Sequence, residues 1–157
     1  MNDDQKESLL RAYVDAAKVM QLATLGPDGP HVCHVWYAIH WPSNRLLFTS
    51  STARNHSVHI AANPAVGGGI LDMDLKALGQ KVRGVAFTGM ARVVPDNDLD
   101  DSLRTFLLRW PKAGLDAAKI RRNEVPHRLY EVQVSRWILH DEVNLTDGPR
   151  FELPVGR

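Results

Sequence analysis

Residues 45–71, with the sequence RLLFTSSTARNHSVHIAANPAVGGGIL, decide the predicted fold. They predict a strand, a polar turn, a short helix and a second strand. Leu46, Leu47 and Phe48 form a short apolar run that is typical of a buried strand. The helix is predicted over residues 53–63, and Asn63-Pro64 ends it because the residue before a proline disfavours the helical conformation.

The turn in this stretch predicts an anion site. Residues 49–52 supply four hydroxyl groups in a row, and we expect Ser50, Ser51 or Thr52 to cap the helix by accepting a bond from a free backbone N–H. A helix start with free N–H groups and a nearby cation, Arg54, favours a bound phosphate. The alternative is a polar turn with a helix cap and no ligand.

Strands and turns dominate the rest of the chain. Hairpin-linked strands with few crossovers favour an antiparallel barrel over a parallel sheet. We expect six or seven strands and three helices in a single domain over residues 1–157, with an irregular tail over residues 145–157. The predicted helices cover residues 4–20, 53–63 and 99–110, with a further helical piece at 113–123; the other predicted strands cover 21–25, 31–40, 81–94, 128–134 and 136–143.

Composition excludes several classes of function. The net charge of +1 gives no argument for nucleic-acid binding, and no apolar run is long enough to span a bilayer. A single cysteine, Cys33, excludes an intrachain disulfide and a multi-cysteine zinc site. The polar stretch at residues 1–7 is not a secretory signal, so we expect a cytoplasmic protein.

Four segments of the chain, taken in order, resemble a known family. They read LATLGPDGPHV at 22–32, LFTSS at 47–51 with RNHS at 54–57 and ANPAV at 62–66, KVRGVAFTGMAR at 81–92, and YEVQVSRWI at 130–138. Together they are similar to the split-barrel flavoproteins related to pyridoxamine 5′-phosphate oxidase. The resemblance implies a mainly β fold, a six- to seven-stranded antiparallel split β-barrel with flanking helices.

The resemblance also implies a cofactor and its site. It implies an FMN-binding, flavin-dependent oxidoreductase, a homodimer that holds FMN between its subunits and acts on a small-molecule substrate. The positions that correspond to the family's phosphate site are Thr49, Ser50, Arg54, Asn55 and His56; those expected at the phosphate or the flavin ring are Gln80, Lys81, Val82, Trp36 and His140. Asn55 and His56 stand where the family has an arginine and a lysine.

Some alternatives stay open at this stage. The basic cluster with which the vitamin-converting members hold their substrate phosphate is not evident, so the substrate is unknown. The seven histidines and the missing lysine at position 56 favour a haem-binding module on the same fold as one alternative, and a deazaflavin in place of FMN is another. Metal ligation is not expected, because no HExxH-like element is present. Gly67–Gly69 indicate either a close approach of a cofactor or a strand bulge.

Overall fold

The structure is a computed structural model, and it describes residues 1–156. Its helices are α1 (Asp3–Ala16), α2 (Asn55–Ala62), α3 (Leu99–Arg109) and α4 (Ala117–Arg121), with single 3-10 turns at Trp41–Ser43, Asp96–Asp98 and Pro111–Ala113. Its strands are β1 (Val19–Gly26), β2 (Gly29–Trp36), β3 (Ala38–His40), β4 (Arg45–Ser51), β5 (Ala65–Ile70), β6 (Arg83–Val93), β7 (His127–Asp141) and β8 (Arg150–Pro154). Among the described residues, no helix combines the length and the hydropathy needed to cross a bilayer.

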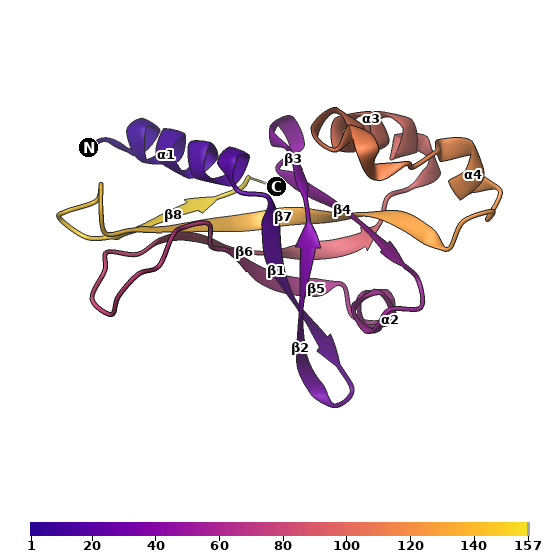
Figure 1. Cartoon of the computed structure of the whole chain (residues 1–157), viewed down its shortest axis with the longest axis horizontal. Coiled ribbons are helices and arrows are strands. Elements are labelled where there is room, and N and C mark those ends of the chain that lie inside the picture. The colour runs from indigo at the N-terminus through magenta and orange to yellow at the C-terminus, as the bar shows by residue number, and fades with distance from the viewer. Residues whose placement is uncertain (157) are drawn as a thin grey trace.

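The strands form one curled antiparallel sheet. Its order is β2-β1-β5-β6-β7-β4-β3, and β8 pairs with β7 outside this path. The long strands β6 and β7 form its axis, with α1 near one end and α3 and α4 near the other (Figure 1). The sheet does not close on itself, and α2 lies beside the end of β4. The predicted split barrel with flanking helices is confirmed.

Strand β4 is buried on both faces, and its sequence explains why. Leu46 and Phe48 point into the main core, where the Phe48 ring stacks on Tyr130 at 5.2 Å between centroids. Leu47 points to the other side and packs in a second core beneath α3, with Leu103 and Phe106. A strand covered on both faces requires a continuous apolar run rather than an alternating one. The run Leu46–Phe48 therefore places β4 between the barrel and α3.

The middle one of the three consecutive glycines of β5, Gly68, leaves space for a side chain of the core. A Cβ on Gly68 would stand 2.3 Å from the ring of Phe87 and 2.4 Å from the Gln21 carbonyl oxygen. Phe87 is buried in the main core and reaches across the strand pair through this gap. The register between β5 and its neighbours shows no bulge here. Gly68 thus makes room for a side chain of the same chain, which neither of the two alternatives had anticipated.

The C-terminal tail differs from its prediction as irregular. Residues Arg150–Pro154 form β8, which pairs with Arg136–His140 of β7. Phe151 and Leu153 alternate with polar residues and pack against the main core, and this period of two is the signal of a half-buried strand. The prediction was wrong because the flanking Gly148-Pro149 and Pro154 were interpreted as loop. Arg157 lies outside the described residues.

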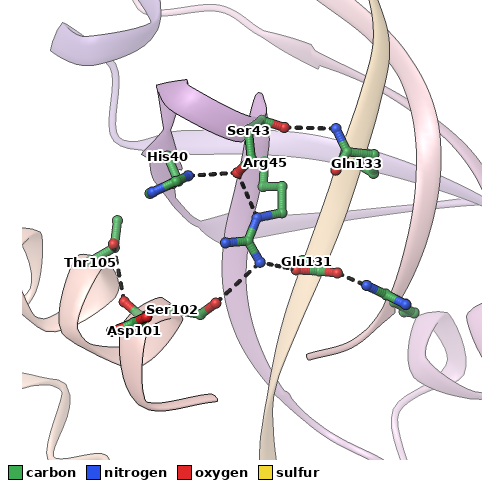
Figure 2. A network of polar contacts seen from close by, with 9 residues as sticks. His40, Ser43, Arg45, Asp101, Ser102, Thr105, Glu131 and Gln133 are labelled. Carbon is green, nitrogen blue, oxygen red and sulfur yellow. Dashed lines mark hydrogen bonds and ion pairs between the residues drawn. The ribbon is translucent and has the colours of Figure 1, made fainter. Parts of the chain in front are cut away.

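A buried carboxylate joins three strands and one helix (Figure 2). Glu131 on β7 is 1% exposed. Its Oε2 accepts from Arg45 Nη1 on β4 at 2.5 Å, and its Oε1 accepts from Arg92 Nε on β6 at 2.7 Å. Arg45 Nη1 also donates to the Ser102 hydroxyl on α3 at 3.2 Å. The network therefore fixes α3 relative to the strands against which it packs.

Neutralising Glu131 tests how much this network contributes to the stability of the fold. We expect Glu131→Gln to lower the free energy of unfolding by about 3 kcal/mol, because it leaves the mostly buried Arg45 guanidinium without its counter-charge. Urea unfolding followed by circular dichroism measures the change. Glu124→Gln is the matched control, since its ion pair with Arg122 lies on the surface. Equal stability of the two variants would contradict a structural role for Glu131.

Candidate functional site

The candidate site is built at the start of α2. Arg54 occupies the N-cap position, and its side chain has only donors, so it makes no capping hydrogen bond. The expectation that Ser50, Ser51 or Thr52 caps this helix is wrong, and so is its predicted start at Ala53. The Ser51 hydroxyl instead accepts from the backbone N–H of Ala53, before the helix begins. The first turn of α2 thus presents backbone N–H groups that the described side chains do not cap, and such groups favour an anion.

Side-chain hydrogen bonds hold α2 in place against β1 and β4. The Ser57 hydroxyl donates to the Ser51 carbonyl at 2.8 Å, and His59 Nδ1 lies 3.0 Å from the buried Thr24 hydroxyl on β1. The His59 ring also fills the space beside Gly26, where a Cβ would stand 2.4 Å from its Nε2. A larger residue at position 26 would displace the ring. The helix start is therefore a rigid part of the fold.

A cleft of about 590 Å³ lies in front of the α2 N-terminus, between β2 and the end of β4. Its volume falls in the range of sites for small molecules and cofactors. The five residues predicted for the phosphate site all line this cleft, so the structure brings them together. The full lining is His31, Cys33, His34, Val35, Thr49, Ser50, Ser51, Ala53, Arg54, Asn55, His56 and His127.

His56 and Ser50 form a buried polar pair at the base of this cleft. His56 Nε2 lies 2.8 Å from the Ser50 hydroxyl oxygen, and both residues are less than 10% exposed. Burial lowers the pKa of His56 below its ordinary value of 6.5, and the neighbouring His31, Arg54 and His59 lower it further. His56 is therefore neutral at pH 7 and supplies a hydrogen-bonding ring rather than a fixed positive charge.

Trp36 lies just outside the cleft. Its side chain is 56% exposed and lines a neighbouring pocket, which meets the cleft at Thr49. The Thr49 hydroxyl donates to the Arg128 carbonyl at 3.2 Å, which fixes this side chain between the two cavities. The structure therefore places Trp36 beside the predicted phosphate residues, although not among them.

The remaining predicted site residues lie elsewhere in the chain. Val82 N donates to Glu142 Oε2 at 2.6 Å, and His140 Nε2 lies 3.8 Å from Glu142 Oε1. Gln80 and Lys81 belong to the same connection between β5 and β6, where the Gln80 side chain bonds the Asp74 carbonyl. This group sits at the far end of β7, on the order of 40 Å from the cleft at the rise of an extended strand. Within one subunit, these residues therefore do not lie beside the residues predicted to hold the phosphate.

The cleft also contains residues that the sequence did not single out for it. Of the described residues, His31, Cys33 and His34 reach it from β2, and His127 reaches it from the start of β7. His31 and His34 both border the cleft, where β2 is the outer strand at the split. The strand register offered a signal for His127, which pairs with Ser51. Within residues 1–156, no three His, Cys, Asp or Glu side chains are grouped as metal ligands.

A curled antiparallel sheet with a polar cleft at its split defines a split-barrel protein. The family model described as pyridoxamine 5′-phosphate oxidase matches residues 7–141. The chain belongs to this family, and the resemblance noted in the sequence is confirmed. A search of the curated proteins found no match.

Solved structures share the fold at low identity. A protein from Clostridium acetobutylicum related to general stress protein 26, of the pyridoxinephosphate oxidase family, aligns with a TM-score of 0.65 and 10% identity over 98% of this chain and 97% of that one. A haem-binding protein from Mycobacterium smegmatis aligns with a TM-score of 0.70 and 17% identity over 92% of this chain and 56% of that one. An FAD-binding protein from Mesorhizobium loti aligns with a TM-score of 0.63 and 17% identity over 83% and 89%. Proteins of this fold thus include an FAD-binding protein and a haem-binding protein.

The lowered pKa of His56 predicts a pH dependence of stability. The unfolded chain holds the His56 proton more tightly than the folded chain, so this contribution to stability is complete above about pH 6.5 and is lost as the pH falls through the folded-state pKa. We expect His56→Gln, whose amide can still bond Ser50, to flatten the fall in unfolding free energy between pH 7 and pH 5. Urea titrations at several pH values measure it. His140→Gln, which changes an exposed histidine, is the control; the same slope in both variants would refute the assignment.

Proposed function

We propose that this chain is an FMN-binding, flavin-dependent oxidoreductase that acts as a homodimer. The observation that carries the proposal is the uncapped start of α2, which faces a cleft together with Ser50, Thr49 and Arg54. Membership of the pyridoxamine 5′-phosphate oxidase family and the FAD-binding protein of the same fold support a flavin over other phosphate esters.

The residues at the start of α2 fit a phosphate. Backbone N–H groups point along the helix axis toward the cleft and carry the positive end of the helix dipole. The Arg54 guanidinium beside them adds a full charge, and the Ser50 hydroxyl is able to donate a further hydrogen bond when the His56 ring donates to it. A dianionic phosphate monoester uses each of these groups. FMN, which ends in such a phosphate, thus matches the donor set better than riboflavin, which lacks it.

The chemistry of the reaction belongs to the flavin, which carries hydride or single electrons when bound. The protein's own residues bind and orient. Arg54 and the α2 N-terminus hold the phosphate, and the pair Ser50–His56 closes the base of the cleft. A separate acid–base pair is not required for transfer of a hydride.

The distribution of the predicted site residues supports the proposed homodimer. Gln80–Val82 and His140 lie far from the cleft of their own subunit, so they take part in a cofactor site only if a second copy brings them to it. The outer face of β2 is exposed beside the cleft and carries Val32, at 55% exposure. An apolar surface on an unpaired outer strand suits contact with another subunit.

Haem is the second candidate ligand. Imidazole is a common ligand of haem iron, and the cleft is bordered by the histidines of β2, α2 and β7 described above. A haem-binding protein has the same fold. A deazaflavin is a third ligand that the same phosphate site accommodates.

The phosphate contact is tested by replacing its cation. We expect Arg54→Gln to weaken FMN binding about tenfold, or ~1.4 kcal/mol, because it removes a charge-assisted hydrogen bond, and to leave riboflavin binding unchanged. Quenching of flavin fluorescence on titration of the protein measures both dissociation constants. Arg104→Gln, on the exposed surface of α3, is the matched control and should bind FMN like the wild type.

Direct competition decides among the cofactors. We expect purified protein to take up FMN in preference to hemin and to a deazaflavin monophosphate. A Soret band with hemin and no flavin binding would replace FMN with haem. An equal loss of FMN and riboflavin affinity in Arg54→Gln would mean that Arg54 supports the fold and does not hold the phosphate.

The subunit arrangement gives a separate test. Light scattering at micromolar concentration should give the mass of two chains. We expect Val32→Asp, a change on the exposed face of β2, to shift the protein toward the monomer because it places a charge in an apolar contact. Leu108→Asp, at an exposed apolar position on α3 outside both β2 and the segment 80–82, is the control. A monomeric wild-type protein that still binds FMN would overturn the shared site.

A further inference from the structure

A second cavity adjoins the cleft, and its walls are of a different kind. It has a volume of about 500 Å³ and lies between the end of β2 and the C-terminal end of α3. Its lining is mainly apolar and aromatic: Trp36, Thr49, Phe106, Trp110, Pro111, Lys112 and Ala113. We refer to it as the tryptophan pocket. The function proposed above assigns no substrate to it.

The two tryptophans of this pocket form a preorganised corner. Their rings meet edge to face, with centroids 4.9 Å apart and an interplanar angle of 82°. Trp110 Nε1 donates to the Tyr37 carbonyl at 2.8 Å, and the Arg109 guanidinium lies over the Trp110 ring at 5.1 Å. These two contacts fix the position of the Trp110 ring, whereas more than half of the Trp36 surface is exposed. A large exposed indole beside a fixed one marks a surface that a further aromatic ring can cover.

The charge of the pocket is limited to one group. Lys112 stands at its edge, and within residues 1–156 its ammonium group forms no ion pair with a carboxylate. Arg109, on the preceding turn, is engaged instead with the carbonyls of Asp15 and Ala17 at the end of α1. One cation among apolar walls suits a ring with a single anionic substituent. It does not suit a phosphate dianion, which needs several donors.

The position of the pocket links it to the cofactor cleft. Thr49 lines both cavities, so occupants of the two would be neighbours on either side of this one side chain. A flavin enzyme requires its second substrate beside the cofactor, in van der Waals reach of the ring. The tryptophan pocket meets that requirement without displacing a phosphate at α2.

We propose that the tryptophan pocket binds the substrate, a planar aromatic molecule with one carboxylate or similar single negative charge. Trp36 packs against its ring, and Lys112 pairs with its charge. This inference rests on the proposed flavin function, because it names the substrate class of that same site. The assignment of the two residues is independent of which atoms the flavin oxidises or reduces.

Calorimetric titration with 2-naphthoate tests the pocket in both the flavin-free and the FMN-loaded protein. We expect 2-naphthoate to bind both forms without displacing FMN. Trp36→Ala should weaken binding about tenfold, because it removes an aromatic contact and its buried area. Lys112→Met should weaken 2-naphthoate by a similar factor and leave the neutral analogue 2-naphthylmethanol unchanged. Lys119→Met, an exposed lysine on α4 outside the pocket, is the control and should match the wild type.

The outcomes separate this inference from the proposed function. Absence of 2-naphthoate binding in a protein that binds FMN overturns the inference alone, as does unchanged affinity in both Trp36→Ala and Lys112→Met. Displacement of FMN by 2-naphthoate shows that the pocket holds the cofactor's own ring, which also overturns it. Binding of 2-naphthoate by a protein that never takes up FMN overturns the substrate role together with the proposed function.

Discussion

The carboxylate of Glu131 is the interaction on which both cavities depend. It lies almost fully buried between Arg45 of β4 and Arg92 of β6, and Arg45 reaches on to Ser102 of α3. β4 ends in the residues of the polar cleft, and α3 ends at Trp110. Because one guanidinium bonds both β7 and α3, the distance between the cleft and the tryptophan pocket is set from within the core. Burying charges in this way loses their favourable solvation free energy. Here the buried ion pairs join elements that are far apart in the sequence.

The fold was predictable because its main signals are local. The apolar run Leu46–Phe48 indicated a buried strand. The structure shows that this strand is covered on both faces, by the barrel core on one side and by α3 on the other. β8 was missed because prolines and glycine frame a strand of only five residues, although Phe151 and Leu153 alternate correctly. The residue that caps α2 was also predicted wrongly, because local propensity alone was used. Propensity indicates which residues can cap, but the backbone path at residues 51–54 decided that the Ser51 hydroxyl bonds Ala53.

The candidate site was predictable only in the part that is contiguous in sequence. Thr49, Ser50, Arg54, Asn55 and His56 line one cleft because eight consecutive residues of strand end, turn and helix start cannot lie far apart. Gln80–Val82 and His140 depend on how strands and subunits are arranged, which no local pattern encodes. The histidines of the cleft are the clearest departure from a lysine-based phosphate site. A ring kept neutral by burial, such as His56, gives the cleft a hydrogen-bonding group rather than a fixed positive charge.

Thr49 belongs to both cavities, and this has a consequence for how such a protein diversifies. A single substitution at this boundary changes the shape of two cavities at once, so, with cofactor and substrate placed as proposed above, the preferences for the two change together rather than separately. Residues that border one cavity alone, such as Lys112 or Arg54, remain free to vary one preference at a time. A lineage that changed its cofactor through position 49 would therefore change its substrate in the same step.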